Sequence, residues 1–389
     1  MYSIGDQYDV AVHFDDEEIV YAATHLIELL IFERADMAVP SLRLALQDTP
    51  YLRETLRVHD ACKITVEVQP RAIAYGTGYE HMVFRLLSVS TAQTPQGDTL
   101  VLHAIYDAPR YVTHIDYAAY EGTSADVARK IAADSGLREF IDASNDAQIW
   151  LRSGVSGYRC LLDILPHAWG GEGSFYGLAV TRSGYLKYVD LGKRRKDEPY
   201  WGFVDHQLLA DRALEDNETV FVDLKAKLNS GFFNHFQGYG VLRQEFDLLE
   251  GSYHPYQEFA LGELEKTTDY LEIRKDMVEM PVRFEPGFVD VGNTHPNYLR
   301  AYAQNLRYWS TYSYRIQIVV SLPMHAYHVL DWVRVESANH IVKGLREVYS
   351  GNYFITAIQS RMSEVAFIQV LELAREGSNT VPESDPPLL

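Results

Sequence analysis

The sequence predicts an α+β protein rich in strands, in which two similar β-barrel or sandwich modules flank a small inserted α+β domain. One observation behind this prediction is a faint internal repeat, in which four strand-like runs recur in the same order later in the chain. Another is a change of pattern between the copies, where helical spacing replaces the alternation typical of strands. The paired runs are residues 41–46 with 313–318, 63–68 with 332–336, 82–90 with 353–360 and 99–106 with 366–373.

Length and composition agree with a large globular protein. A chain of 389 residues has room for about two to four domains, and a hydrophobic share of 47% is ordinary for such proteins. No apolar run reaches the roughly 20 residues that cross a bilayer, and the acidic residues 1–16 show no secretory signal. The two cysteines, Cys62 and Cys160, suit a reducing compartment. They are too few to hold zinc alone, and a disulfide between them stays open.

The charge balance limits the range of partners. A formal net charge of -19 argues against a nucleic-acid binder, which needs a cationic surface. It permits a negatively lined passage along which DNA slides without sticking, and it equally fits plain solubility. The 27 tyrosines suit protein interfaces, because each joins a large apolar ring to a polar tip, although tyrosine also serves in cores.

The first β module is predicted over residues 1–112. Leucines alternate with other residues over 42–46, and Ile64, Val66 and Val68 alternate with polar residues, which is the period of a half-buried strand. Residues 94–98 (TPQGD) supply turn chemistry between two longer runs. Residues 17–33 are ambiguous, because their composition suits a helix while 29–33 equally suits a strand.

A small α+β domain is predicted over residues 113–205. Thr123 and Asp126 resemble a capping box before a helix that ends at Gly136. A second short helix over 158–165 is bent or ended by Pro166, and a hairpin turns at 183–184 between strands 176–180 and 185–190. Residues 192–197, with their Lys-Arg-Arg-Lys core, are predicted to end the domain as an exposed loop.

The second β module is predicted over residues 206–375. It includes a strand at 219–224, a loop rich in glycine and aromatic residues at 231–240, and a helix at 294–310 with Pro296 in its first turn. The apolar stripe of that helix consists of Leu299, Tyr302, Ala303 and Leu306. Residues 376–389 read as a mobile tail.

The last strand-like run is apolar on both faces. Phe367, Leu371 and Leu373 lie on one face, and Ile368 and Val370 lie on the other. A strand of this kind is buried on both sides, and the 294–310 helix is the expected cover on one of them. A partner subunit in an assembly, or a second layer in a monomer, explains the other side equally well.

No catalytic constellation with specific spacing is present. The sequence has no nucleophile elbow, no phosphate-binding loop and no His-Glu-x-x-His. His325 and His328 offer a weak metal pair, residues 15–18 an acidic turn, and residues 193–196 a phosphate contact, but solvated surface explains each more simply. Among 54 acidic residues, carboxylate pairs for glycoside hydrolysis arise by chance. We therefore predict no catalytic, cofactor-binding or metal residues and no cofactor.

The middle of the chain resembles a known family. Residues 121–132 (EGTSADVARKIA) continue to Gly136, and 145–150 (NDAQIW), the 158–165 helix and 184–188 (GYLKY) follow. This order is similar to the baseplate hub proteins of contractile-tailed bacteriophages and to the hub portion of type VI secretion spike proteins. In that family, a segment with helix, Asn-x-x-Gln-x-Trp, helix and small hairpin lies between two tube-forming domains. Residues 349–355 and 370–375 resemble the family's closing hairpin.

The resemblance covers most of residues 80–375 and implies a structural role. It implies a homotrimer whose six tube-forming modules make a pseudo-sixfold ring joining the tail tube protein to a central spike protein. Baseplate wedge proteins surround such a ring, and DNA passes through its lumen without specific binding. The implied location is the tail baseplate of a virion, assembled in the host cytoplasm. The implied domains are tube-forming modules at 1–112 and 206–375, the small domain at 113–205 and the tail at 376–389.

Two alternatives remain open at the sequence level. One is a tail-associated glycoside hydrolase that acts on the cell wall, although no lysozyme-like domain is visible. The other is the hub of a contractile injection system that carries no genome, because such a hub shares the geometry of a phage hub. The residues that touch tube, spike or wedges cannot be assigned from sequence.

Overall fold

The computed structural model describes most of the chain between residues 2 and 376. Side chains are described for most of these residues. For the others, which include 2–4, 17–18, 92–94, 240–247, 252–258 and 281–289, the structure describes the backbone alone. The described ranges are 2–4, 8–15, 17–18, 26–47, 58–59, 61–70, 80–94, 97–210, 212–227, 240–247, 252–258, 281–289, 294–320, 327–338, 349–363 and 366–376.

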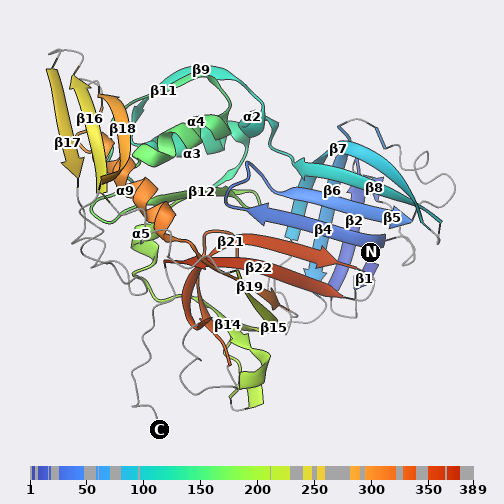
Figure 1. The fold of residues 1–389 in the computed structure, drawn as a ribbon. Helices are drawn as coiled ribbons and strands as arrows, with labels where there is room; N and C mark the ends of the chain where they lie inside the picture. The colour runs from blue at the N-terminus through green and yellow to red at the C-terminus, as the bar shows by residue number, and fades with distance from the viewer. Residues whose placement is uncertain are drawn as a thin grey trace, which may run out of the picture.

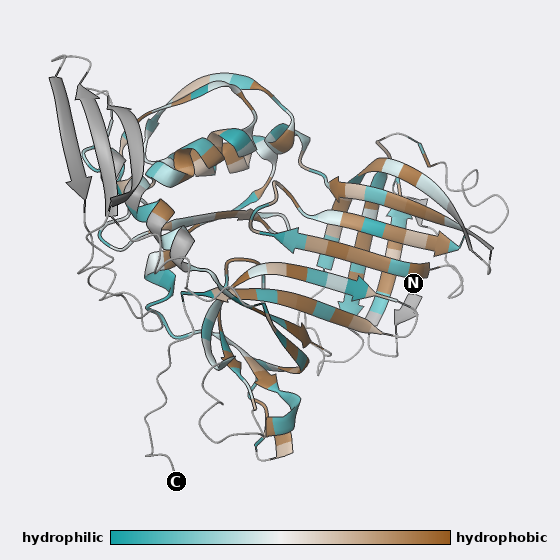
Figure 2. Ribbon diagram, viewed as in Figure 1, coloured by the Kyte–Doolittle hydropathy of each residue, from teal (hydrophilic) through white to brown (hydrophobic). Residues whose placement is uncertain are grey.

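The first part of the chain forms an antiparallel sheet, called here the N-terminal sheet, with strand order β1-β2-β6-β7-β8-β5-β4. Its strands are β1 (Tyr2–Ile4), β2 (Tyr8–Phe14), β4 (Leu26–Arg34), β5 (Ser41–Gln47), β6 (Lys63–Pro70), β7 (Glu80–Thr94) and β8 (Gly97–Tyr106), with the short β3 (Glu17–Glu18) against β2. Alternate residues of β5 and β6 are buried, as predicted, and hydrophobic and hydrophilic residues alternate along the strands in Figure 2. The ambiguous residues 29–33 belong to strand β4.

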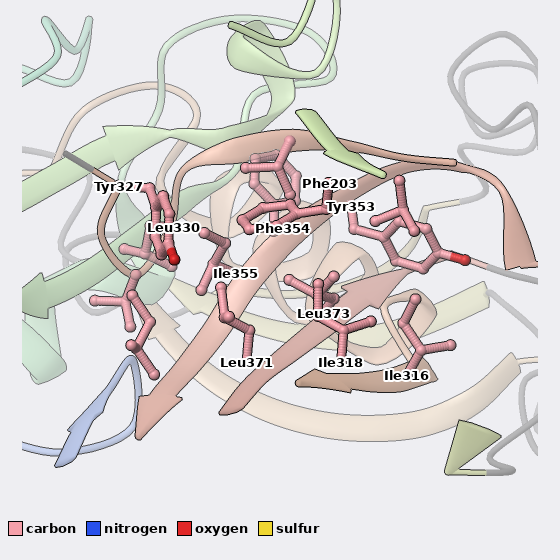
Figure 3. Close-up of a cluster of buried hydrophobic side chains, with 14 of the residues drawn as sticks. Phe203, Ile316, Ile318, Tyr327, Leu330, Tyr353, Phe354, Ile355, Leu371 and Leu373 are labelled. Atoms are coloured by element: carbon pink, nitrogen blue, oxygen red, sulfur yellow. The ribbon is translucent and has the colours of Figure 1, made fainter. Parts of the chain in front are cut away.

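The last part of the chain closes into a six-stranded barrel. Its strands are β14 (Trp201–Asp205), β15 (Glu218–Lys227), β19 (Tyr314–Val320), β20 (Trp332–Glu336), β21 (Gly351–Met362) and β22 (Phe367–Arg375). Each pairs with the next in the order β14-β15-β19-β22-β21-β20, and β20 returns to β14. Closure removes the free edges of these strands. Figure 3 shows the core inside, where Phe203, Ile318, Tyr353 and Leu373 meet.

The N-terminal sheet and the barrel are one continuous sheet. Strand β4 pairs antiparallel with β21, in a register that places Arg34 opposite Ala357 and Leu29 opposite Met362. Met362 and Phe367, at the far end of the β21–β22 hairpin, are buried in the core of the N-terminal sheet rather than in that of the barrel. Residues from the two ends of the chain therefore share one core (Figure 1).

The strand runs of the predicted repeat occupy equivalent places in the two parts of this sheet. In the N-terminal sheet, neighbours follow the order β6-β7-β8-β5, and all three pairings are antiparallel. In the barrel, the order is β20-β21-β22-β19, again with three antiparallel pairings. The surroundings differ, because β14 runs parallel to β20 whereas β2 runs antiparallel to β6.

Between these parts lies a central segment of helices and small sheets. It contains α2 (Pro109–Val112), β9 (Asp116–Gly122), α3 (Ser124–Ser135), β10 (Arg138–Ile141), β11 (Gln148–Val155), α4 (Gly157–Ile164), η2 (Leu165–His167), β12 (Tyr176–Val180), β13 (Tyr185–Asp190) and α5 (Leu191–Arg194). The predicted capping box of Thr123 and Asp126 and the left-handed cap at Gly136 are both present. The predicted hairpin is β12–β13. The proposed boundary at residue 205 falls after β14, which pairs within the barrel.

Helix α9 (Tyr298–Thr311) differs from its prediction. It begins after Pro296, with Asn297 at its N-cap, rather than including that proline in its first turn. Its fully buried positions are Ala301, Gln304, Asn305 and Tyr308, while Tyr302 and Leu306 of the predicted stripe are half-buried and the side chains of Leu299 and Ala303 lie outside the described part. The helix packs against η2 of the central segment, and its Tyr308 also lies in the barrel core with Leu371 and Leu373 of β22. That the helix covers β22 stays a prediction. In that strand, Ile368 and Val370 are half-buried.

The predicted basic loop at residues 192–197 and the two cysteines can also be compared with the structure. Residues 191–194 form α5 rather than a loop, and the side chain of Arg195 is buried against Glu376. Cys62 and Cys160 are buried free thiols.

Strand β15 extends the predicted 219–224 run, and a three-stranded sheet of β17 (Ser252–Glu258), β16 (Gly240–Asp247) and β18 (Pro281–Val289) follows. Residues 231–239 and 377–389, and hence the predicted loop and tail, lie outside the described residues. No described helix combines the length and hydrophobicity needed to cross a membrane.

Candidate functional site

Buried ion pairs join the N-terminal sheet, the central segment and the barrel. The guanidinium of Arg182, in the β12–β13 turn, lies 3.1 Å from a carboxylate oxygen of Glu33 on β4 and 3.0 Å from one of Glu80 on β7. It also donates to the carbonyl oxygen of Tyr327, just before β20. All three charged side chains are almost fully buried. One cation therefore fixes three segments that are distant in sequence.

The electrostatics of this joint keep Glu33 ionised. Burial alone would raise the pKa of the Glu33 carboxyl, but the Arg182 charge, the nearby His328 imidazole and a hydrogen bond from the Val329 N–H lower it to about 2. The neighbouring carboxylates in turn hold the pKa of Arg182 above its usual value despite burial. The cluster is thus a buried group of three charged side chains rather than a proton-transfer site at neutral pH.

A second joint fixes the turn that precedes β20. The ammonium of Lys187 on β13 lies 2.5 Å from Asp331 and donates to the Val329 carbonyl oxygen at 3.0 Å. Leu330 takes a left-handed backbone conformation, with φ of 67°, and packs against Gly177 on β12. Left-handed backbone is uncommon for a side chain branched like leucine. The turn is therefore held by contacts with the central segment.

The Asn-x-x-Gln-x-Trp segment is a structural clasp. The buried carboxylate of Asp146 accepts hydrogen bonds from the Ser124 N–H at 2.8 Å, the Ser124 hydroxyl at 2.6 Å and the Trp169 N–H at 2.9 Å. Gln148 accepts from the His295 N–H, and the Trp150 indole donates to the Gly122 carbonyl oxygen. These contacts tie the start of α3 and the approach to α9 to β11. The motif thus explains local folding and leaves no group free for catalysis among those named.

Polar residues of α9 bind it to the central segment. The Gln304 side-chain amide donates to the Ser174 carbonyl oxygen at 2.6 Å, and that of Asn305 donates to the Ala168 carbonyl oxygen at 2.9 Å. The Asn305 oxygen accepts from the Tyr176 N–H, and the Trp309 indole donates to the Tyr176 carbonyl oxygen. Buried amides of this kind are satisfied, so the buried face of α9 is partly polar.

An apolar surface lies on the two-stranded ribbon of β9 and β11, which curves over α3 and α4 in Figure 1. The register places Ala119 opposite Leu151 and Tyr117 opposite Ser153, on the face away from the helices. Tyr117 is 79% exposed, Leu151 69% and Ile149 49%. The opposite face carries buried Tyr120 and Trp150. This outward face is therefore a candidate contact surface.

Two of the cavities within the part of the chain that the structure describes lie at the joints between the N-terminal sheet, the central segment and the barrel. The larger, about 470 Å³, is lined by Lys187, Arg194, Trp201, His328 and Asp331 among others. The other, about 350 Å³, is largely apolar. Its lining includes Leu165, Tyr176, Trp309, Leu330 and Phe354. In the larger cavity, Asp331 is held by Lys187, so this carboxylate is committed to a structural contact.

The sequence candidates for chemistry that the structure describes take part in structural contacts. His328 lies beside Glu33, while His325 lies outside the described residues. Of the basic run, Arg194 pairs with Asp142 at 2.8 Å and Arg195 with Glu376 at 2.9 Å, so neither is a free phosphate contact. The prediction of no catalytic, cofactor or metal residues stays a prediction.

One group of metal-ligand types does come together, and sequence analysis missed it. Asp15, His59 and Cys62 each place a donor atom within 4.8 Å of the others. Asp15 belongs to the predicted acidic turn at residues 15–18, and the structure places its carboxylate beside His59 and Cys62. The visible signal was the His-x-x-Cys spacing of residues 59–62.

Comparisons with known proteins place the fold. No protein-family model and no curated protein matches the sequence. A tail protein from Neisseria meningitidis MC58 matches 95% of this chain and 97% of its own, at 13% identity and a TM-score of 0.56. The 43 kDa tail protein of prophage MuSo2 from Shewanella oneidensis matches 94% of this chain and 98% of its own, at 9% identity and a TM-score of 0.58.

A third similar structure is a Francisella PdpA-VgrG complex in its lidded form. It matches 98% of this chain at 10% identity and a TM-score of 0.51, and the match spans 54% of that chain. Identities this low establish likeness of fold only. The β-rich chain with its closed barrel therefore has the fold of these tail proteins, in agreement with the resemblance to baseplate hub proteins that its sequence carries.

Proposed function

We propose that this chain is the structural baseplate hub of a phage-type contractile tail, without enzymatic activity. The observation that carries the proposal is the likeness of fold to two tail proteins over nearly the whole length of all three chains. In this role the chain is a homotrimer that adapts the tail tube protein to the central spike protein within the wedge proteins of the baseplate. Its location is the tail of a virion, assembled in the host cytoplasm.

The proposal includes two similar tube-forming modules, at about residues 1–112 and 206–375, with the domain at 113–205 inserted between them. The matching strand orders β6-β7-β8-β5 and β20-β21-β22-β19 support this layout. Because β14 pairs within the barrel, we place the start of the second module at about residue 200. Three chains then supply six related modules, which is the number that a pseudo-sixfold ring needs.

The charge of the chain supports passage of DNA. A net charge of -19 repels the phosphate backbone, so a lumen lined by acidic residues lets DNA slide without being bound. A structure of the assembled ring with a neutral or basic bore would contradict this part of the proposal.

We propose that the apolar face of the β9–β11 ribbon contacts a neighbouring subunit. In an antiparallel pair, one face is ordinarily buried and the other polar, but here the outward face carries Tyr117, Ile149 and Leu151. A two-stranded ribbon is also marginally stable by itself. Cover by a second copy of the chain accounts for both features.

The test is the native mass of the purified chain, measured by light scattering at micromolar concentration. We expect about three times the chain mass of 44.4 kDa. Leu151→Lys places a charge on the ribbon surface and is expected to lower the mass toward that of a monomer. Leu87→Lys, at a site 62% exposed on β7, is the matched control and should leave the trimer intact. A wild-type monomer would contradict the trimer, and equal effects of both variants would contradict the ribbon contact.

A second candidate is the hub of a contractile injection system that carries no genome. The observation that favours it is the likeness to the PdpA-VgrG complex over almost the whole of this chain. Genes for a capsid and a terminase beside that of the hub would favour the phage tail, and their absence from a complete locus would favour the injection system.

A further inference from the structure

We propose that Asp15, His59 and Cys62 form a binding site for a zinc-type divalent metal ion at one end of the N-terminal sheet. The three donors are a carboxylate oxygen, an imidazole nitrogen and a sulfur, which together suit Zn²⁺ and Co²⁺ rather than Ca²⁺ or Mg²⁺. A water molecule would complete a tetrahedral shell. The site does not depend on a role of the chain in a tail.

The strand register brings the three residues together. Strands β2 and β6 are antiparallel neighbours, with Phe14 opposite Ile64, so the residue after β2 meets the residues before β6. The Asp15 N–H donates to the Lys63 carbonyl oxygen at 2.9 Å, and the Lys63 N–H donates to Oδ1 of Asp15 at 2.9 Å. The Asp15 carboxylate is therefore fixed beside the 59–62 turn.

The turn at residues 59–62 spaces His59 and Cys62 as metal-binding turns space their ligands. The Cys62 N–H donates to the His59 carbonyl oxygen at 3.1 Å, which closes a tight turn with two residues between the ligands. That gap is the one used by Cys-x-x-Cys pairs in structural zinc sites. Ala61 has φ of 60° and Asp15 has φ of 48°. These are two of the three non-glycine residues with positive φ in the described part, and such strain gathers at functional sites.

The distances are close to those of a metal shell. Ligands bonded to zinc at about 2.0 to 2.3 Å in a tetrahedron lie roughly 3.3 to 3.8 Å from one another. The three donor atoms already lie within 4.8 Å, and Nε2 of His59 is 2.7 Å from Oδ2 of Asp15. Binding would replace the contact between His59 and Asp15 with two metal bonds.

The local charges permit a cation to bind. The Asp15 carboxylate, which accepts a hydrogen bond from the Lys63 N–H, supplies negative charge to the site. Cysteine binds metal ions as the thiolate, so metal binding at Cys62 would release the thiol proton. Arg85 lies near and donates to the Ala61 carbonyl oxygen, but Asp107, at 2.6 Å, offsets its charge.

The simpler interpretation is a hydrogen-bonded clasp without metal, and the experiment separates the two. The chain is stripped with a chelator, and CoCl₂ is titrated in while the absorption spectrum is recorded. We expect one Co²⁺ per chain, a thiolate-to-cobalt charge-transfer band in the near ultraviolet, and its loss when Zn²⁺ is added. A clasp without metal gives no such band.

Variants assign the ligands. His59→Ala and Cys62→Ser should each weaken Co²⁺ binding by at least about 100-fold, as expected for loss of a direct ligand. The matched controls, Cys160→Ser and His206→Ala, should bind as the wild type does, although His206 also lies beside an aspartate, Asp205. Because His59 is exposed, its variant should keep the fold, and it decides the question even if the buried Cys62 variant unfolds.

A second measurement does not rely on spectroscopy. Zn²⁺ that binds only the folded chain should raise the Tm of the wild type and of Cys160→Ser, and leave that of His59→Ala unchanged. Absence of the charge-transfer band in the wild type, or equal Co²⁺ affinity of the wild type and His59→Ala, would overturn the site.

Discussion

At the scale of single residues, buried charges lie where separate parts of the chain meet. Arg182 connects the central segment to β4 and β7 of the N-terminal sheet, and Arg195 connects α5 to Glu376, directly after β22. Once such charges are taken out of water, each requires its partner, since an unpaired buried charge is far costlier than an exposed one. Removing one partner of such a pair is therefore expected to be strongly destabilising.

Removing the Arg182 cation should strongly destabilise the protein. Arg182→Met leaves Glu33 and Glu80 buried without compensation, and we expect a loss of about 3 to 5 kcal/mol in the free energy of unfolding. The control is Arg159→Met, which removes the exposed i,i+4 pair with Asp163 and should cost less than about 1 kcal/mol. Urea unfolding of both variants measures the difference. Similar losses in the free energy of unfolding for the two variants would mean that burial does not determine how much an ion pair contributes to stability.

The lowered pKa of Glu33 predicts a loss of stability in acid. The folded-state pKa is about 2 and the ordinary value is 4.5, so the folded chain binds this proton more weakly than the unfolded chain. The contribution of Glu33 is therefore complete above about pH 5 and is lost as the pH falls toward 2. The free energy of unfolding, measured between about pH 3 and 6, should fall more steeply for the wild type than for Glu33→Gln.

The control for this pH dependence is Glu139→Gln, which changes an exposed carboxylate on β10. It should keep the wild-type slope. If Glu33→Gln kept the wild-type slope as well, the acid sensitivity would arise from other carboxylates.

Sequence alone could not identify these residue-scale contacts. Arg182 and Glu33 are 149 positions apart, and neither stands out in a periodic pattern. Two members of the metal-ligand group, His59 and Cys62, could be recognised in the sequence because they are three residues apart. Asp15 could not, because only the register of β2 and β6 brings it beside them. The clasp of Asp146 was visible as a family-like motif, whereas its hydrogen-bond partners were not.

At the scale of elements, short-range signals were sufficient where the chain folds locally. The capping box and Gly136 placed α3 closely, and the turn at Gly184 placed the β12–β13 hairpin. Helix α9 was placed less well, because Pro296 fits a first helical turn yet precedes the N-cap here. The rule that the buried face of a helix is apolar also failed for α9, because Gln304 and Asn305 lie on its buried face. Their side chains form hydrogen bonds to loops of the central segment, and no local sequence pattern reveals these contacts.

Two glycines should respond to substitution for different reasons. A Cβ on Gly192 in α5 would lie 2.0 Å from the Gly173 carbonyl oxygen, so Gly192→Ala requires the backbone to move and should cost about 1 to 3 kcal/mol. At Gly136 nothing lies within 4 Å, and the cost of alanine, about 1 kcal/mol, comes from φ of 71°.

Asparagine separates these causes, because it tolerates left-handed backbone better than alanine does. Gly136→Asn should be less destabilising than Gly136→Ala, whereas Gly192→Asn should be at least as destabilising as Gly192→Ala. Thermal unfolding of the four variants gives the comparison. A rescue by asparagine at both sites would show that steric contact with Gly173 is not the cause.

At the scale of the whole molecule, the sequence predicted two related β parts but not their continuity. Period-two patterns identify strands and their faces, and they do not say which edges pair. The parallel pairings of β14 with β15 and β20, which close the barrel, join residues that no hairpin connects. The β4–β21 pairing likewise joins strands from opposite ends of the chain that no hairpin connects. Long-range register was therefore the part of the fold that lay beyond prediction.

Because the sheet is continuous, a residue near the C-terminal end should control the stability of the N-terminal sheet. The Phe367 side chain, 2% exposed, is buried with residues of β4, β5 and β8 rather than with the barrel core. Phe367→Ala should therefore cost about 3 to 5 kcal/mol and speed amide hydrogen exchange in β5 and β8. Ile318→Ala, in the barrel core on β19, is the matched control and should speed exchange in β15 and β22 first. Faster exchange confined to the barrel in both variants would mean that the two cores are energetically separate despite the shared strand, and that the β4–β21 pairing transmits no stability between them.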